Sequence, residues 1–336
     1  MDLNTLWFIL ITVLFTGFLV LEGFDYGVGI LLPFLGKKDE ERRMILTTIG
    51  PLWDSNEVWM ITAGGAMFAA FPQVYATLFS GAYLALVLLL FGLILRGVGF
   101  EFRSRLTSSR WRNAWDWLLF LGSLIPAVLW GAVVGNLMRG LAIDERMVYW
   151  GGLLPLLNPF ALWAGVTFVA IFIMHGANFL ALRTTGEVEK RAKALAFKAW
   201  IVAVIVTVIF VVWAFFATDI LTKPGLNGLV PAILAAIALL LVGFFLRQRR
   251  HGWAFAMGTL TVVFATIMVF AGLYPRILIS TQNPDYSLTI YNASSSPYTL
   301  RVMTIVALIF VPIVLAYLAW TYKVFSDRVT GKKVVY

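Results

Sequence analysis

Four carboxyl side chains lie inside long apolar stretches of the sequence, where ionisable groups are rare. Glu22 and Asp25 belong to one stretch, and Asp54 and Glu57 belong to the next. The two acids of each pair are three positions apart, so each pair shares one face of a helix. Carboxyls held away from bulk water usually mark a route for protons or cations, because an isolated charge is costly there. The spacing therefore predicts proton transfer or cation binding.

The sequence contains few other side chains that could act as metal ligands, haem ligands or nucleophiles. The chain contains two histidines and no cysteine, which excludes disulfides, zinc–thiolate sites, iron–sulfur clusters and cysteine nucleophiles. His175 lies inside an apolar stretch, but a single histidine without a second ligand at usable spacing is weak support for a haem site. We expect His175 to be a hydrogen-bonded packing residue. We expect no metal ligand and no catalytic residue on this chain.

The elements that must position these residues are predicted to be transmembrane helices. Hydrophobic residues make up 61% of the 336 residues and charged residues 13%, whereas a soluble domain is nearer half apolar and a quarter charged. A hydrocarbon core of about 30 Å takes about 20 apolar residues to cross, and only a helix satisfies its own backbone there. The sequence predicts an all-α integral membrane protein with about nine spans, near Leu6–Leu32, Leu52–Phe71, Val74–Leu95, Trp117–Leu137, Pro159–Leu182, Ala199–Thr218, Leu226–Leu246, Trp253–Tyr274 and Leu300–Tyr322.

Lysine and arginine residues are distributed unevenly between alternate loops. One set of loops, together with the C-terminal tail, holds 21 of the 26 basic residues, and the other set holds 5. Cytoplasmic loops are enriched in Lys and Arg. We therefore expect a multi-pass protein of a prokaryotic plasma membrane, with its N-terminus outside and its C-terminus in the cytoplasm. The net charge of +9 sits in these loops and gives no reason to expect a nucleic-acid partner.

In this orientation the four acids are predicted to form a ladder if their helices are neighbours. Asp54 would lie nearest the cytoplasm, Glu57 and Asp25 deeper, and Glu22 deepest. Arg96, at the cytoplasmic edge of the third span, is the expected charge partner of Asp25 or Asp54. Two simpler roles remain open. Asp54 is in the first turn of its helix, where an acid caps free N–H groups, and Arg96 could be an end-of-helix cation that reaches the headgroups.

A short internal similarity suggests two parallel halves. Gly23–Tyr26 in the first span is followed by a charged stretch, and Gly176–Phe179 in the fifth span is followed by another. Four spans separate the two copies, so both run in the same direction, unlike the inverted repeats of many transporters. We predict one membrane domain over residues 1–336, built of two four-helix bundles, at 1–138 and 159–275, with a peripheral ninth helix at 299–325.

Several motifs in the first 140 residues resemble one known family. They are Gly23-Phe24-Asp25-Tyr26-Gly27-Val28-Gly29, Trp53-Asp54-Ser55-Asn56-Glu57-Val58-Trp59, Thr62-Ala63-Gly64-Gly65-Ala66, Arg96-Gly97-Val98-Gly99-Phe100-Glu101-Phe102-Arg103 and Trp111-Arg112-Asn113-Ala114-Trp115-Asp116. Together they resemble subunit II of the cytochrome bd-type quinol oxidases. Beyond residue 140 the resemblance rests on the number of spans and the length of the chain.

This resemblance implies a complex that oxidises membrane quinol and reduces O₂ to water, and that builds a proton gradient without pumping. A haem-bearing subunit I would hold haems b and d, and this chain would ligate neither. Subunit II would stabilise the assembly and supply a cytoplasmic proton path through Asp54 and Asp25, with Arg96 as their partner. Trp53 would border a lipid or quinone tail. A small single-helix subunit is a further partner that the resemblance suggests.

Two other interpretations of the same residues remain open. A stand-alone proton-coupled or cation transporter would use these carboxyls, but it would also need a substrate cavity and paired helix breaks, and the sequence has no obvious paired breaks. A purely structural scaffold would use the acids only to cap helices and to pair with arginine.

Overall fold

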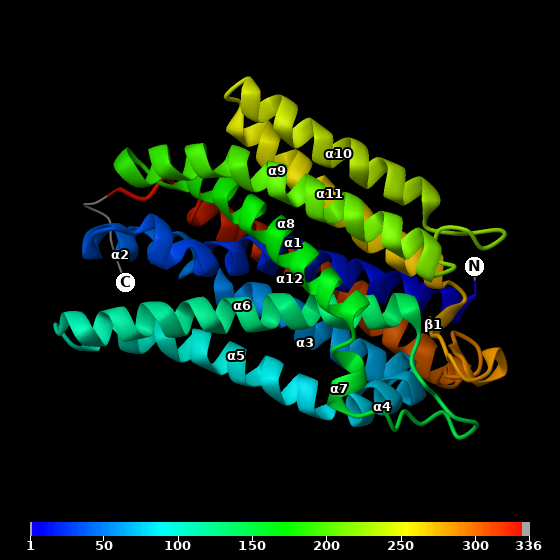
Figure 1. Cartoon of the computed structure of the whole chain (residues 1–336). Helices are drawn as coiled ribbons and strands as arrows, with labels where there is room; N and C mark the ends of the chain where they lie inside the picture. Colours follow the sequence, from blue (N-terminus) through cyan, green and yellow to red (C-terminus); the bar gives the residue numbers. More distant parts are fainter. Residues whose placement is uncertain (1, 331–336) are drawn as a thin grey trace.

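The computed structural model describes residues 2–330, and most of them are helical (Figure 1). Within this part of the chain there are twelve α-helices and one two-stranded antiparallel sheet. The helices are α1 Leu3–Leu35, α2 Asp39–Ile49, α3 Trp53–Ala70, α4 Pro72–Gly81, α5 Tyr83–Phe102, α6 Ser109–Arg139, α7 Leu153–Leu156, α8 Pro159–Arg183, α9 Gly186–Ala217, α10 Leu229–Arg247, α11 His251–Leu273 and α12 Pro297–Val324. The strands are β1 Arg276–Leu278 and β2 Leu288–Thr289. The predicted all-α membrane fold is confirmed.

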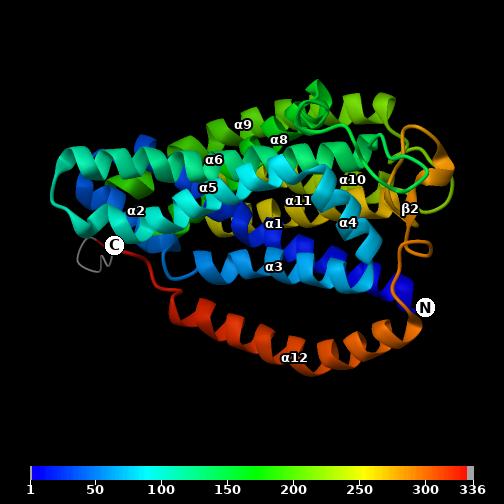
Figure 2. The ribbon, with the colours of Figure 1, turned by 90° about the horizontal axis from the view of Figure 1, so that it is seen from below.

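Eight of the described helices are long and apolar enough to cross a membrane, namely α1, α5, α6, α8, α9, α10, α11 and α12. The remaining predicted span, Leu52–Phe71, corresponds to α3. This helix has 18 residues, two of which are the acids Asp54 and Glu57, and it is not among the eight. It packs along α1 (Figure 2). The ninth crossing therefore remains a prediction.

The bounds predicted for the third span, Val74–Leu95, are wrong, because the chain forms two helices there, α4 and α5. Pro72 lacks an N–H and begins α4, and it keeps Phe71 out of the helical conformation, at φ −132° and ψ 66°. Because α5 continues to Phe102, Arg96 lies inside a helix rather than at its end, and its side chain is fully buried and does not reach the headgroups. The open role of Arg96 as an end-of-helix cation is thereby excluded.

Close helix crossings hold the bundle together. α1 crosses α8 where Gly27 meets Gly176, and a Cβ added to Gly27 would lie 1.9 Å from the carbonyl oxygen of Phe172. α5 crosses α6 in the same manner, since a Cβ on Gly122 would lie 2.8 Å from the backbone nitrogen of Arg96. Small residues let helix backbones approach this closely, which is how helices gain packing energy in a membrane. The second crossing sets the depth at which Arg96 enters the bundle.

The helices of each predicted four-helix unit contact one another. In the first, α1 packs on α3 and α6, and α5 packs on α6; in the second, α8 packs on α9 and α11, and α10 packs on α9 and α11. Figure 1 shows α9 to α11 on one side, α5 and α6 on the other, and α1 and α8 between them. Because α1 and α6 also pack extensively on α8, the division into two units stays a prediction.

The two ends of the bundle differ, and α12 is attached mainly near its ends. The N-terminus of α1 and the two strands lie at one end, and α2 and the C-terminal segment lie at the other (Figure 1). Of the residues in α12, only Leu300 and Thr321 are buried, and Figure 2 shows this helix standing outside α3. After α12 the chain returns to the α8–α9 turn, where the N–H of Val329 donates to the carbonyl of Arg183 at 2.7 Å. A broad apolar face of α12 is left uncovered.

Candidate functional site

Arg96 lies at the centre of a buried group of charged side chains. The side chains of Arg96, Glu22 and Asp25 are fully buried. Nη1 of Arg96 donates to Glu22 at 2.6 Å and to Glu57 at 3.0 Å, and Nη2 lies 3.7 Å from Oδ2 of Asp25. These four residues are termed the acid–arginine cluster. Three of the four predicted acids thus meet the predicted charge partner.

Aromatic rings hold the guanidinium of Arg96 in place. Its Cζ lies 4.9 Å from the ring centre of Tyr26 and 5.9 Å from that of Phe100. The face of an aromatic ring attracts a cation, and the attraction is stronger away from water. Phe100 is itself stacked on Trp53, with 5.2 Å between the ring centres and 11° between the planes. These contacts fix Arg96 between α1, α3 and its own helix.

The acid–arginine cluster contains more acids than one cation can balance. If every group were ionised, it would carry three negative charges and one positive charge, and only Glu57 has a side chain in partial contact with solvent, at 15% exposure. Burying unbalanced charge is strongly unfavourable. Oε1 of Glu22 and Oδ1 of Asp25 are buried without a hydrogen-bond partner among the described residues. The cluster is therefore suited to hold protons on some of its carboxyl oxygens.

Two residues that were not predicted from the sequence extend the cluster. Asn56 is fully buried, and its Nδ2 donates to Oδ2 of Asp25 at 2.7 Å. The hydroxyl of Tyr322, on α12, donates to Oδ1 of Asn56, also at 2.7 Å. Asn56 stands directly before Glu57 in the α3 motif, so a polar residue between two acids was an available signal. No sequence feature links Tyr322 to this site.

Asp54, the predicted cytoplasmic end of the ladder, lies outside the acid–arginine cluster. Its side chain is exposed, and it makes no hydrogen bond or ion pair with any other described residue. Neither the pairing with Arg96 nor a capping hydrogen bond is therefore present. Asp54 still comes one helical turn before Glu57 on α3, so the expected order of these two acids along the helix is retained.

A second group of charges ties α2 to the turn between α5 and α6. Arg103 is almost completely buried and donates to Asp116 at 2.6 Å and to Asp39 at 2.9 Å. Arg42 donates to Asp116 and Arg112 to Asp39, both at 2.7 Å. Each acid here is matched by two arginines, unlike the acids around Arg96. We interpret this network as structural support for the end of the bundle that carries α2.

The family model for subunit II of the cytochrome bd terminal oxidases matches residues 3–325. The chain belongs to this family. It is 41% identical to cytochrome bd ubiquinol oxidase subunit 2 of Bacillus subtilis, over 99% of this chain and 98% of the relative. Cytochrome bd-I ubiquinol oxidase subunit 2 of Escherichia coli is 38% identical, over 99% of this chain and 96% of the relative.

A solved structure has the same fold as this subunit II chain. It is the bd oxidase of Geobacillus thermodenitrificans, with a TM-score of 0.80 and 16% identity over 97% of this chain and 99% of the other. Membership of the family confirms the resemblance and supports a subunit of a terminal respiratory oxidase over a stand-alone transporter. The chain is thus part of a bacterial oxidoreductase complex in a membrane, which implies haems and at least one partner subunit in that complex.

His175 of this subunit II chain is packed among aromatic rings. It is fully buried, lies parallel to Phe255 with 4.5 Å between ring centres, and meets the edge of Phe24 at 5.9 Å. A Cβ on Gly258 would come within 3.0 Å of its Nδ1. The part of the chain from residue 2 to 330 contains no group of three or more His, Asp or Glu side chains that could hold a metal ion. These surroundings are those of a packing residue.

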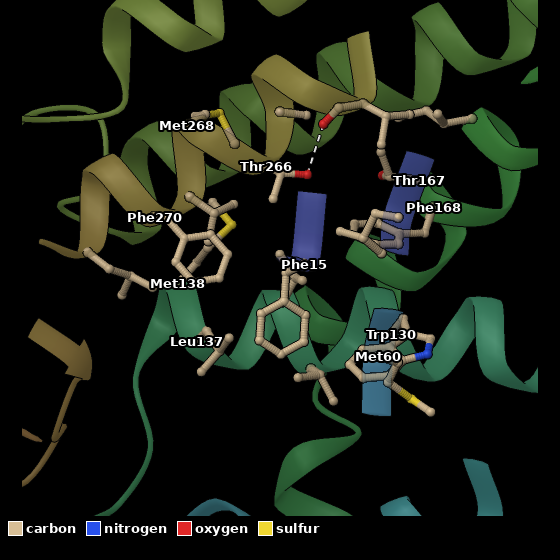
Figure 3. Close-up of a pocket in the computed structure, with 18 of the residues that line it drawn as sticks. Phe15, Met60, Trp130, Leu137, Met138, Thr167, Phe168, Thr266, Met268 and Phe270 are labelled. Atoms are coloured by element: carbon tan, nitrogen blue, oxygen red, sulfur yellow. Dashed lines mark hydrogen bonds between the residues drawn. The ribbon is translucent and has the colours of Figure 1, made fainter. Parts of the chain in front are cut away.

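A large cavity of this subunit II chain is separate from the acid–arginine cluster. It measures about 900 Å³, and its mainly apolar wall includes Phe15, Trp130, Phe168 and Phe270 (Figure 3). The hydroxyls of Thr167 and Thr266 also face it, but each donates to a carbonyl of its own helix. Trp53 is not among the lining residues. The cavity suits an apolar chain rather than an ion.

Proposed function

We propose that this chain is subunit II of a complex that oxidises membrane quinol and reduces O₂ to water, and that it supplies protons from the cytoplasm for this reaction. The observation that carries the proposal is the surplus of acids around Arg96. One acid per arginine is enough to join two helices, whereas Arg96 is surrounded by Glu22, Asp25 and Glu57. The additional carboxyls can take up protons inside the membrane. Family membership supplies the reaction that consumes them.

The proposed path runs inward along α3. Asp54 is exposed and exchanges protons with water, and Glu57, one turn further, keeps 15% of its side chain exposed. Glu57 shares Nη1 of Arg96 with Glu22, while Nη2 faces Asp25. The guanidinium therefore holds the three carboxyls within reach of one another. A proton taken up at Asp54 passes to Glu57 and then to the two buried acids.

We further propose that the N-terminus is outside and the C-terminus is in the cytoplasm. The basic segments are joined to one another at a single end of the bundle, which supports this orientation. Arg191 at the start of α9 donates to Glu41 of α2 at 2.5 Å, and Arg328 after α12 donates to Glu189 at 2.9 Å. Grouping of Lys and Arg at one end is the pattern expected of a cytoplasmic face.

The haem-bearing subunit I is proposed to dock on the side formed by α3 and α12. α12 buries almost none of its own surface, although its composition is strongly apolar. α3 also exposes large apolar side chains, among them Val58, Ile61 and Phe68. A partner on this side would lie beside Asp54 and the acid–arginine cluster. A small single-helix subunit is the second proposed partner.

Haems b and d are proposed to belong to the partner subunit. His175 is proposed to be a packing residue and not a haem ligand, because it is fully buried in contact with Phe255 and Phe24, and a haem needs open space at its axial ligand. The apolar cavity is proposed to take the tail of a quinone or a lipid, which its lining of aromatic and aliphatic side chains favours. Trp53 has no part in that cavity and instead supports Phe100.

The test replaces Asp25 with Asn and Glu57 with Gln in the purified complex. Both changes keep the shape of the side chain but remove an exchangeable acid, so quinol-driven O₂ consumption should fall by at least about tenfold. The haem absorption bands should stay near wild type. Glu101→Gln is the matched control, since Glu101 is an exposed acid on the same helix as Arg96, and it should leave the rate unchanged.

The contrary results are equally clear. Wild-type turnover in both Asp25→Asn and Glu57→Gln would show that the proton path does not run through these residues. A loss of haem in direct proportion to the loss of activity would instead favour the structural scaffold.

A further inference from the structure

α12 reaches the interior of the bundle at its last turn. Most of the helix is exposed, but the side chain of Tyr322 turns inward to Asn56. The segment that follows α12 is fixed too, because Arg328 donates to the carbonyl of Ala181 at 3.3 Å and Val329 is buried beside the α8–α9 turn. Tyr322 is therefore held from both sides, and its hydroxyl has a defined position.

Asn56 connects this hydroxyl to Asp25. Its amide has one end that donates and one end that accepts, so a partner that fixes one end also fixes the other. The hydroxyl of Tyr322 donates to Oδ1, which leaves Nδ2 to donate to Asp25. Asn56 and Asp25 are fully buried and Tyr322 is half-buried, so water has little access to the bond between Asn56 and Asp25.

Asp25 is the acid of the cluster that lies farthest from Arg96, and its hydrogen bond comes from Asn56 instead. Arg96 lies 2.6 Å from Glu22 and 3.0 Å from Glu57, but 3.7 Å from Asp25. Both the contact with Arg96 and the hydrogen bond from Asn56 fall on Oδ2 of Asp25, and Oδ1 has no hydrogen-bond partner. A proton can therefore bind at Oδ1 and leave again without disturbing the bond to Asn56.

We infer that Tyr322 and Asn56 are positioning residues of the proton path, which keep a donor pointed at Asp25 so that it can release its proton. This inference rests on the proposed function of the acid–arginine cluster. It gives the peripheral helix α12 a direct role in a site built by α1, α3 and α5.

The charged and titratable groups around this site are few. Asp25 faces Glu22 on its own helix, Glu57 on α3, Arg96 on α5 and Tyr322 on α12. α8, which packs on another face of α1, contributes His175 against Phe24 and Arg183 near Tyr322. Of these groups, only Tyr322 is linked to Asp25 through an intermediate side chain, that of Asn56, which is hydrogen-bonded to both.

Removal of the Tyr322 hydroxyl should change the pH dependence of turnover. Without it, Asn56 can turn its oxygen towards Asp25, and this oxygen accepts a hydrogen bond only from a protonated carboxyl. The protonated form gains a bond and the ionised form loses one, so Asp25 gives up its proton at higher pH. The acid side of the activity profile should move upward by about one pH unit, as expected for one hydrogen bond to a charged group.

The experiment measures quinol-driven O₂ consumption against pH, and haem absorbance, in membranes that contain the whole complex. Tyr322→Phe keeps the ring and removes the hydroxyl. Tyr291→Phe is the control, because Tyr291 is exposed in the loop between β2 and α12, at the end of the bundle that carries the strands. Asn56→Leu breaks the same chain in its middle and should give the same upward shift. Asp25→Asn is measured in parallel to test the path itself.

The outcomes separate the inference from the proposed function. An upward shift in Tyr322→Phe and Asn56→Leu, with full haem content and an unchanged Tyr291→Phe, supports the inference. A wild-type pH profile in Tyr322→Phe beside a slow Asp25→Asn overturns the role of Tyr322 alone, and full turnover in Asp25→Asn overturns the proton path. If Tyr322→Phe loses haem, the test rests on Asn56→Leu, which supports the inference if it keeps its haem and shows the upward pH shift. Loss of haem in both variants shows that the two residues are structural and overturns the inference.

Discussion

A carboxyl in contact with water and a carboxyl buried beside a guanidinium serve different steps of proton transfer. Asp54 is exposed and unpaired among the described residues, so in the proposed path it is the acid that exchanges protons with water. Glu22 and Asp25 are fully buried and are held around Arg96. In the proposed path Asp54 takes up the proton, the two buried acids hold it, and Glu57, partly exposed and bonded to Arg96, links them.

Asp54→Asn should slow quinol-driven O₂ consumption by about two- to tenfold, less than Asp25→Asn, because water can still reach Glu57 directly. Asparagine keeps the size of the side chain, so haem content should not change. Proton uptake by vesicles that contain the complex is the second measurement. Turnover at full speed, with normal uptake, would place Asp54 outside the path.

His175→Ala should leave the haem absorption bands of the assembled complex intact, although the loss of ring packing against Phe255 lowers its stability. Phe255→Ala is the control, since it disturbs the same aromatic packing without removing a nitrogen ligand. Loss of one haem from the assembled His175→Ala complex, but not from the control, would show that His175 is a ligand.

Helical spacing and the cost of buried charge selected Glu22, Asp25, Asp54 and Glu57 from the sequence, and three of these four acids lie at Arg96. Arg96 itself was expected at the edge of a span, with its role left open. The link from Asp25 through Asn56 to Tyr322 could not be selected in this way. It joins residues 266 positions apart, and it depends on where the loosely packed α12 returns to the bundle. Hydropathy places α12 in the membrane but does not say which helix it meets.

At the scale of helices, hydropathy located the apolar stretches of the sequence but not the residues at which the helices begin and end. The break between α4 and α5 lies at Ala82, and both helices are apolar, so an average over 20 residues runs through it. α6 and α9 begin earlier than predicted, at Ser109 and Gly186, because helices continue past the membrane into polar segments. Bounds of this kind depend on capping and contacts rather than on apolarity.

Gly27→Val should destabilise the complex strongly, because a Cβ at this position lies 1.9 Å from a carbonyl oxygen of α8. The two backbones must separate, at a cost of about 3 kcal/mol or more. Gly252→Val is the control, since nothing lies within 4 Å of a Cβ there and Gly252 is exposed near the start of α11. Thermal unfolding of the complex in detergent should show a large drop for Gly27→Val only. Equal drops would place the α1–α8 crossing elsewhere.

Glu41 should stabilise the contact between α2 and α9 at neutral pH but not in acid. Burial alone raises the pKa of Glu41, but hydrogen bonds from the N–H groups of Lys37 and Lys38 and from Arg191 hold it below its ordinary value of 4.5. A carboxyl with a lowered pKa stabilises the fold above its ordinary value, and the gain disappears as the pH falls through the lowered value.

Glu41→Gln should therefore unfold at a lower temperature than wild type at pH 7, and the difference should shrink as the pH falls below about 4.5 and vanish once the pH lies below the lowered pKa of Glu41. Glu40→Gln changes an exposed neighbour and should have little effect at either pH. A difference between Glu41→Gln and wild type that persists in acid would contradict the role given to the carboxylate.

For the whole molecule, the proposed orientation assigns the two ends of the bundle to opposite sides of the membrane. Reporter fusions after Lys193, near the end that carries α2, should report the cytoplasm. Fusions after Asp285, between the two strands, should report the exterior. The 21 basic residues of one loop set predict this result, and the opposite signal at either site would reverse or break the topology.

The return of α12 to α3 also has a consequence for biosynthesis. α12 is the last of the described helices to leave the ribosome, and Tyr322 can reach Asn56 only after it does. Until then the amide of Asn56 lacks its bond to Tyr322. The acids of the proposed path are thus all synthesised before Tyr322, the residue proposed to orient Asn56.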